Sequence, residues 1–515
     1  MDEGSRVSIQ LPPKWTLVAR DAFNGAVLWK RKIPTWHSHL WPLKSGPTQL
    51  ARRLVAVDEV VYATLGIDAP LTKLNAATGE TIHTYEGTKA TEEIIASGDQ
   101  VFALVNENEW ELEGFNPVFN TGDQTRIRNE FKWNEKSRHL AGLNAKTGKL
   151  LWKVPTKVAP LTLTVDDERV YFHDDEKVVC LDRNTGKRLW AGKPVSRERT
   201  MNFNFGPKLV AYKGVVLYAG GERKMVAMDA KSGKELWTSA HERGGYQSPE
   251  DLLVLKDLIW SAPLTSGKDS GVFTGRNYRT GEVEKSFPPN VETYWFHHRC
   301  YIAKATENFL LPSRTGIEFV DPAKEHWDIH HWVRGGCLYG IMPCNGLVYA
   351  PPHNCACYPE AKLYGFNALA PATDSRTAIL NKLAKSKRRQ PLIKGAAFGK
   401  LLTQNNSQPS ASSKDWPTFR GDASRSGATK HDIATDLKPS WKTKLGGKLT
   451  SVVVADGRLF VAQINQHRVV ALDGKTGKEL WSFMTGGRVD SPPTAHKGAI
   501  LFGSADGWGY CLRAT

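Results

Sequence analysis

One short phrase recurs along this chain and constrains the fold more than any single residue does. It begins with Asp or Asn, usually continues through two residues to Thr or Ser and Gly, and ends four residues later in Trp. Five full copies run from Asp21 to Trp29, Asn144 to Trp152, Asp182 to Trp190, Asp229 to Trp237 and Asp473 to Trp481. A phrase that returns in this way indicates a repeat architecture.

The first half of the phrase has the chemistry of a tight turn. An Asp or Asn side chain can bond to its own backbone two residues on, and Gly supplies the positive φ that such a turn needs. Apolar runs with strand composition precede the turn, as in Val178–Leu181 and Val469–Leu472. The phrase therefore predicts a β-hairpin, and the large ring at its end is expected to bury against a neighbouring unit. The repeat tryptophans are Trp29, Trp152, Trp190, Trp237 and Trp481.

Weaker copies extend the pattern. His83 replaces the tryptophan after Asn75–Gly79, and Phe287 is expected to take over the packing after Asn277–Gly281. A further strand precedes each hairpin, as in Arg169–Phe172. The turns recur every roughly 40–50 residues, which is the length of a four-stranded propeller blade.

The strand followed by Leu-Asp-x-x-Thr-Gly-Lys-x-Leu-Trp resembles the repeat of the quinoprotein-type (PQQ-like) β-propellers. This family includes quinone-dependent alcohol dehydrogenases and the BamB-like propeller lipoprotein of outer-membrane protein assembly. The resemblance covers nearly the whole chain outside a central linker. It implies an all-β propeller of about eight four-stranded blades and a location in the periplasm or cell envelope.

The repeats divide the chain into three parts. Residues 1–370 are expected to form a propeller of seven or eight blades, with an insertion at about 106–136. Residues 371–414 have the basic, Ser/Asn/Gln-rich composition of a linker, and residues 415–515 hold the start of a second propeller. Because about two blades alone would leave strand edges uncovered, we expect the sequence to be a fragment of a larger bacterial protein.

The net charge of +16 does not predict a nucleic-acid-binding protein. Nine basic residues and no acidic one lie between Arg376 and Lys414, inside the linker. Such a run is typical of a solvated tether, and the sharper alternative is contact with an anionic surface. No apolar run is long enough to be a transmembrane segment, and the first residues lack the features of a signal peptide.

The most unusual composition lies between Trp295 and Tyr358, which holds five of the seven cysteines and six of the fifteen histidines. This sector contains the candidate ligand or metal site, formed by His297, His298, Arg299, His330, His331, Arg334, Tyr339 and His353. Its cysteines are candidates for disulfides, for metal ligands or for buried structural thiols: Cys300, Cys337, Cys344, Cys355 and Cys357. Cys180 and Cys511, which lie in other strands, are expected to be buried.

Two classes of function follow. The first is a binding or scaffold module that holds other proteins, or a small-molecule or carbohydrate ligand, at the propeller funnel. The second is an oxidoreductase or a carbohydrate-active enzyme that uses the His/Cys/Tyr cluster, with Tyr301, Tyr339 or Tyr358 as the acid. The resemblance alone raises PQQ as a cofactor, and the Cys/His sector raises a metal. Quinone dehydrogenases of the family carry two adjacent cysteines and a calcium shell, whereas this chain has no Cys-Cys pair, so the binding module is favoured.

Overall fold

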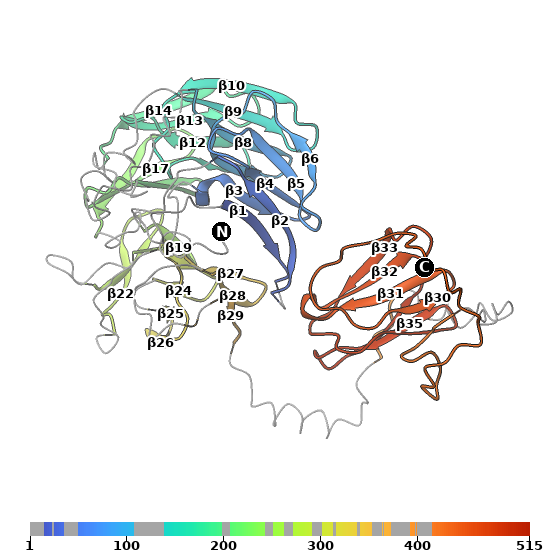
Figure 1. Cartoon of the computed structure of the whole chain (residues 1–515). Helices are drawn as coiled ribbons and strands as arrows, with labels where there is room; N and C mark the ends of the chain where they lie inside the picture. Colours follow the sequence, from blue (N-terminus) through green and yellow to red (C-terminus); the bar gives the residue numbers. More distant parts are fainter. Residues whose placement is uncertain are drawn as a thin grey trace, which may run out of the picture. The chain divides into compact units, whose positions relative to one another are not determined.

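The computed structural model divides the chain into two compact units (Figure 1), the first comprising Met1–Ala19 and Trp29–Pro371 and the second Arg20–Leu28 and Ala372–Thr515. The structure describes residues 15–22, 25–35, 50–107, 138–197, 207–242, 251–261, 271–290, 301–312, 316–336, 340–352, 363, 365–371, 392–396, 398 and 415–515. Much of the predicted insertion, the helix-like stretch at 376–387 and most of the linker lie outside these residues.

The part of the chain before Pro371 is built from β-strands and one 3-10 helix, η1 (Leu50–Arg53), among the residues that the structure describes. The strands are β1 (Trp15–Arg20), β2 (Val27–Ile33), β3 (Leu54–Val57), β4 (Val60–Thr64), β5 (Leu71–Asn75), β6 (Thr81–Thr84), β7 (Thr91–Ser97), β8 (Gln100–Val105), β9 (Arg138–Asn144), β10 (Leu150–Thr156), β11 (Thr164–Val165), β12 (Arg169–His173), β13 (Lys177–Asp182), β14 (Arg188–Pro194), β15 (Lys208–Tyr212), β16 (Val215–Ala219), β17 (Lys224–Asp229), β18 (Glu235–Ala240), β19 (Leu253–Leu255), β20 (Leu258–Ser261), β21 (Phe273–Asn277), β22 (Val283–Phe287), β23 (Lys304–Ala305), β24 (Leu310–Leu311), β25 (Ile317–Asp321), β26 (His326–His330), β27 (Met342–Cys344), β28 (Leu347–Ala350) and β29 (Asn367–Leu369).

These strands form antiparallel meanders that follow one another along the chain. Six sheets have four strands, from β3–β6 through β23–β26, while β1–β2 is a pair and β27–β29 has three strands. The first strands of neighbouring sheets contact each other, as β3 does with β7 and β7 with β11. This arrangement of four-stranded sheets confirms the all-β propeller fold.

The second unit contains two sheets and a 3-10 turn, η4 (Ile464–Gln466). Its strands are β30 (Val453–Ala455), β31 (Arg458–Gln463), β32 (Arg468–Asp473), β33 (Glu479–Met484), β34 (Thr494–His496), β35 (Ala499–Gly503) and β36 (Gly509–Arg513). The segment that opens the unit joins both sheets: Trp416 forms a bridge with Val454, and the carbonyl of Pro417 accepts the N–H of Ala495.

The predicted Asp-to-Gly turn forms as expected between the third and fourth strands of a sheet. Between β13 and β14, Oδ1 of Asp182 accepts hydrogen bonds from the N–H groups of Asn184 and Thr185 and from the Thr185 hydroxyl. Gly186 closes the turn at φ +69°, a backbone conformation that glycine adopts without steric cost. In the degenerate copy that begins at Asp321, Glu325 takes the positive φ instead.

Each repeat tryptophan packs on the turn of the following sheet, which explains why the two residues recur together. The ring of Trp152 covers Gly186, where an added Cβ would lie 2.7 Å from ring carbon Cδ2. Its indole N–H also donates to the carbonyl of Arg183, at 2.8 Å. The same contacts join Trp190 to Gly233 and Trp237 to Gly281. Side chain and turn therefore form one interlocking junction between consecutive sheets.

At two junctions between sheets, a side chain other than tryptophan donates the hydrogen bond to the turn of the next sheet. The ring of His83 covers Gly148, and Lys73 and Tyr85 donate to the carbonyl of Ala145 at 2.9 and 3.1 Å. Phe287 is buried in a core cluster that spans two sheets and stacks on Phe273, as predicted from its place after the weak turn.

In sheet β19–β22, Lys285 occupies the position that tryptophan holds in the preceding sheets. This role of Lys285 was not predicted from the sequence. Lys285 pairs with Gly275, as Trp237 pairs with Ala227 in the preceding sheet. Its ammonium group donates to the carbonyl of Pro322 at 3.3 Å. A lysine can therefore replace the indole N–H as the hydrogen-bond donor, while a separate aromatic residue, Phe287, provides the buried ring.

Candidate functional site

The antiparallel order of the strands gives each sheet two different ends. The first-to-second and third-to-fourth connections lie at one end, which we call the turn rim. It carries the Asp182–Gly186 turn and its equivalents. The second-to-third connections and those leading to the next sheet lie at the opposite end, the loop rim. The connections that leave β8, β14, β18, β20, β22 and β28 are among the longer ones, and all start at the loop rim.

The described histidine and arginine candidates of the predicted His/Cys/Arg sector lie on the loop rim. His330 ends β26, His331 follows it as an exposed residue, and Arg334 is buried at 3% exposure. Burial lowers the pKa of His330, and the neighbouring His331 adds to this effect. The neutral imidazole that results is the form that binds metals or accepts protons. The remaining candidates, His297, His298, Arg299, Tyr339 and His353, lie outside the described residues.

Tyr301 does not present a free hydroxyl for acid catalysis. It is buried at 1% exposure, and its hydroxyl donates to the carbonyl of Gly316 at 2.6 Å. The N–H of Gly316 in turn donates to the buried carboxylate of Glu318. These bonds give Tyr301 a structural role, while Tyr339 and Tyr358 lie outside the described residues.

Of the five cysteines in the sector, Cys344 is the one that lies among the described residues. Cys344 is an exposed, free thiol at the turn rim, where it pairs with Leu347 at the start of β28. Cys355 and Cys357 come after the other end of that strand, outside the described residues together with Cys300 and Cys337. Cys344 is thus held at the rim opposite to the one where His330 lies.

The two cysteines predicted to be buried differ. Cys180 is fully buried, as expected, and burial raises the pKa of its thiol to about 12. The prediction for Cys511 is wrong, because this residue is exposed. It pairs with Leu501, which is 40% exposed, on the face of sheet β34–β36 that no other described sheet covers. Strand composition alone does not reveal which face of an end sheet is covered.

The described residues contain no ligand group for the proposed metal. In the part of the chain that the structure describes, no group of three or more His, Cys, Asp or Glu side chains could hold a metal ion. The calcium shell that the resemblance to quinone dehydrogenases implies is therefore not supplied by these residues. Metal binding by the remaining His and Cys residues of the sector stays a prediction.

A buried charged network at the loop rim was not predicted. Glu92 on β7 accepts hydrogen bonds from Nε of Arg138 at 2.7 Å and from Nδ2 of Asn106 at 2.9 Å. Burial alone would raise the pKa of Glu92, but Arg138 and the nearby Arg52 and Arg53 outweigh it and lower the pKa. Since Asn106 and Arg138 flank the predicted insertion, Glu92 ties its two ends together. The charge doublets Arg52-Arg53 and Glu92-Glu93 were the sequence signal for this network.

Two half-buried lysines lie where first strands begin at the loop rim. Burial lowers the pKa of Lys208 on β15, an effect that Asp251 opposes and that Lys304 on β23 reinforces. Burial also lowers the pKa of Lys304. The effect of Lys304 on Lys208 shows that the two ammonium groups are near enough to interact.

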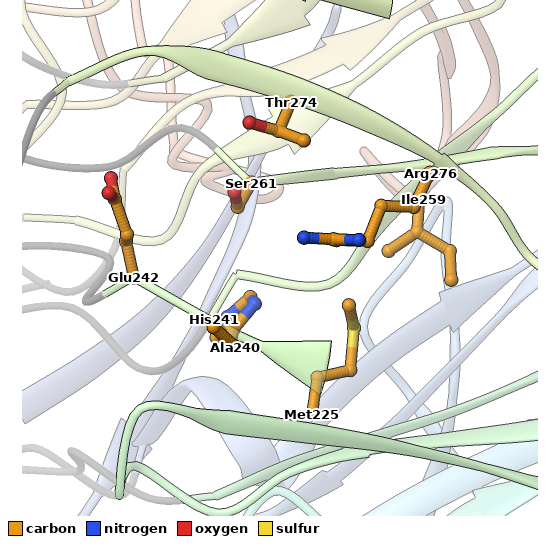
Figure 2. Close-up of a pocket in the computed structure, with 8 residues that line it drawn as sticks. All are labelled: Met225, Ala240, His241, Glu242, Ile259, Ser261, Thr274 and Arg276. Atoms are coloured by element: carbon orange, nitrogen blue, oxygen red, sulfur yellow. The ribbon is translucent and has the colours of Figure 1, made fainter. Parts of the chain in front are cut away.

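A pocket of about 120 Å³ lies between sheets β15–β18 and β19–β22 (Figure 2), and we call it the polar pocket. Its lining residues are Met225, Ala240, His241, Glu242, Ile259, Ser261, Thr274 and Arg276. Ser261 pairs with Thr274 and Ile259 with Arg276, so these four side chains share one face of their sheet. Figure 2 shows the Arg276 guanidinium between the Ser261, Thr274 and His241 side chains, with the Glu242 carboxylate well apart from it.

The electrostatics of the polar pocket depend on Arg276. Its Nη1 donates to the carbonyl of Gly281 at 3.0 Å, and burial lowers its pKa. No described carboxylate forms an ion pair with this guanidinium. The hydroxyls of Ser261 and Thr274 make no hydrogen bond to another described residue. The pocket therefore offers a cation and two hydroxyl groups to a bound molecule. None of its residues was among the predicted site residues.

Comparisons with known proteins find similarity to propeller repeats in two segments of the chain. Residues 133–258 and 424–514 match the family model described as outer membrane protein assembly factor BamB. Among solved structures, BamB from Moraxella catarrhalis is 13% identical with a TM-score of 0.42, and the match covers 66% of this chain and 94% of that one. The computationally designed Ika8 protein is 9% identical with a TM-score of 0.37, over 92% of this chain and 98% of the other. No curated protein sequence matches the chain.

The matched segments contain the full turn phrases at Asn144, Asp182, Asp229 and Asp473, each seated between the third and fourth strands of a sheet. Because the family match falls on the repeats whose turns and tryptophans form the sheet junctions, these two segments of the chain carry PQQ-like, BamB-like propeller repeats.

Proposed function

We propose that this protein is a binding scaffold of the cell envelope, and that its loop rim holds a partner protein. The contrast between the two rims supports this proposal. The turn rim consists of short turns closed by their own Asp or Asn side chains, whereas the loop rim carries the longer connections. Binding residues in repeat folds concentrate on such connections, because the sheets below hold them in place.

The observation that carries the proposal is an exposed tryptophan on the loop rim. Trp332 follows β26 and is 64% exposed, although the repeat tryptophans are buried or half-buried at sheet junctions. Its carbonyl accepts the N–H of Leu363, which fixes the backbone beneath the ring. Exposed, backbone-anchored tryptophans are frequent centres of protein interfaces, since they bury a large area with little loss of side-chain entropy.

The cell-envelope location rests on the family. The matching family model is described as an outer membrane protein assembly factor, so we extend an envelope location and a protein partner to this chain. Among the described residues no helix is long and apolar enough to cross a membrane. The predicted site at His330, His331 and Arg334 lies on the same rim as Trp332 and belongs to this proposed binding face.

Site-specific photo-cross-linking in cells tests the proposal. A photoreactive phenylalanine derivative replaces Trp332 on the loop rim or, as the matched control, Lys231 in the exposed Asp229–Gly233 turn of the turn rim. We expect a discrete envelope-protein adduct from position 332 and none from position 231. Equal adducts at both positions, or none at position 332 in a folded variant, contradict the proposal.

A further inference from the structure

The polar pocket differs in composition from the same face of three other sheets. The pocket face of sheet β19–β22 carries two cross-strand pairs, one formed by Ile259 and Arg276 and the other by Ser261 and Thr274. The corresponding pairs in sheet β11–β14 are Val170 with Leu181 and Phe172 with Val179, and all four residues are buried in an apolar cluster. Sheet β15–β18 has Val216 with Met228 and Tyr218 with Val226 at the same positions. Sheet β7–β10 has Val101 with Leu143 and Ala103 with Ala141. At these positions the three sheets carry aliphatic and aromatic side chains, and Tyr218 has the single hydroxyl among them.

Sheet β19–β22 keeps the backbone register and changes the chemistry. Ile259 pairs with Arg276 and Ser261 with Thr274, so three of the four positions are polar. Arg276 stands immediately before its turn residue Asn277, as Leu181 stands before Asp182. Placing a guanidinium where a leucine would pack costs stability unless the charge gains a partner.

The turn itself does not require this arginine. Arg276 donates to the carbonyl of Gly281, and Arg20 makes the same bond to Gly25 in the β1–β2 hairpin. The turn after Leu181 has no arginine before it and still forms. In that turn the N–H of Gly186 donates to the carbonyl of Asp182, just as the N–H of Gly281 donates to the carbonyl of Asn277. The guanidinium has five N–H donors, and its bond to Gly281 uses one of them.

We propose that the polar pocket binds a short-chain monocarboxylate anion. The carboxylate would accept hydrogen bonds from Arg276, Ser261 and Thr274, because a planar guanidinium matches the two oxygens of a carboxylate. Met225 and Ile259 give the pocket an apolar wall for the alkyl chain; both belong to the apolar cluster of this junction.

Size and charge narrow the class of ligand. A volume of about 120 Å³ corresponds to about four water molecules at roughly 30 Å³ each, so the ligand has only a few non-hydrogen atoms. The Glu242 carboxylate and the His241 ring also line the pocket. Arg276 supplies a single positive charge to the pocket, so a singly charged anion matches it better than a dianion such as phosphate.

Calorimetric titration of the whole chain with sodium propionate tests this proposal, with sodium chloride, propanol and propylammonium chloride as controls. We expect saturable binding of propionate alone. Arg276→Gln should weaken it at least about tenfold, since a charge-assisted two-point contact is lost. The matched control is Arg20→Gln, which removes the same bond to a turn glycine outside the pocket and should leave propionate affinity unchanged.

A second variant keeps the test decisive if Arg276→Gln does not fold. Ser261→Ala combined with Thr274→Val removes both hydroxyls and retains the size of Thr274, so we expect a folded protein with several-fold weaker binding. Propionate heats that equal those of sodium chloride would overturn the proposal. Unchanged affinity in either pocket variant, or tighter binding of phosphate than of propionate, would also overturn it.

Discussion

The junction between sheets β7–β10 and β11–β14 and the junction between sheets β15–β18 and β19–β22 share one backbone plan and differ in what fills it. In the first, Phe102, Leu104 and Trp152 pack against Val170, Phe172 and their neighbours in one apolar cluster. In the second, the equivalent face carries Ser261, Thr274 and Arg276 beside a pocket. Since strand register and turn are the same, the fold tolerates a polar site at a junction as long as the surrounding apolar contacts remain.

The largest expected effect is at the apolar junction. Trp152→Ala removes a nearly buried ring and its hydrogen bond to Arg183. We expect the free energy of unfolding to fall by about 3–5 kcal/mol, because the site cannot collapse around the missing ring. Urea denaturation of the variant measures this. Leu151→Ala is the control: Leu151 is 40% exposed, and its loss should change stability by less than about 0.5 kcal/mol.

The second prediction concerns the glycine under the tryptophan. Gly186→Ala and Gly214→Ala both place a Cβ at positive φ, at a common cost of about 1–2 kcal/mol. Only at Gly186 does the new Cβ overlap the Trp152 ring, whereas nothing lies within 4 Å at Gly214. Gly186→Ala should therefore cost about 1–3 kcal/mol more than Gly214→Ala. Equal denaturation midpoints for the two variants would show that the ring yields without cost.

A reciprocal exchange sharpens the comparison between the junctions. Val179 and Thr274 occupy the same position in their sheets. Val179→Thr buries a hydroxyl in the apolar junction and should lower stability by about 1–3 kcal/mol. Thr274→Val should leave stability within about 0.5 kcal/mol of wild type, because the hydroxyl faces the pocket. A large loss of stability from Thr274→Val, measured by the same denaturation, would assign Thr274 a structural role.

The smallest effect depends on pH. Hydrogen bonds from Thr185 and Ser232 hold the pKa of the Asp182 and Asp229 carboxyls below their usual range. A carboxyl with a lower pKa in the folded state contributes stability above the unfolded-state pKa of about 3.9, and this is lost as the pH falls through the folded-state value. We expect acid titration of stability to be shallower in the Asp182→Asn/Asp229→Asn variant. Asn75 and Asn144 already close the same turn, so the substitutions should preserve its geometry.

Local sequence was sufficient to predict the turns and the packing role of the tryptophans. The side-chain bonds of Asp182 and the positive φ of Gly186 involve residues within one turn, so their types reveal the structure. The substitute Lys285 was missed because its partner, the carbonyl of Pro322, lies in the next sheet. The network around Glu92 was missed for the same reason, although the charge doublets offered a signal.

The candidate site was predicted less well than the fold. Clustering in sequence indicated the sector from Trp295 to Tyr358, yet the structure sends Cys344 to the turn rim and His330 to the loop rim. Successive strands carry neighbouring segments to opposite ends of a sheet, so sequence proximity does not give spatial proximity. Arg276 could have been found by aligning the repeats, since it replaces the Leu or Met found before the turns at Asn75, Asn144, Asp182 and Asp229, as Arg20 does before Asp21.

The sequence by itself determined the repeat, the hairpin turns and the all-β propeller fold, because these depend on hydrogen bonds and backbone conformations within a few residues. The tertiary structure decided which side chains meet across a junction, which rim each segment reaches, and that Arg276, Ser261 and Thr274 share one pocket. Those relations depend on contacts between sheets, which distant parts of the chain create only when they pack together.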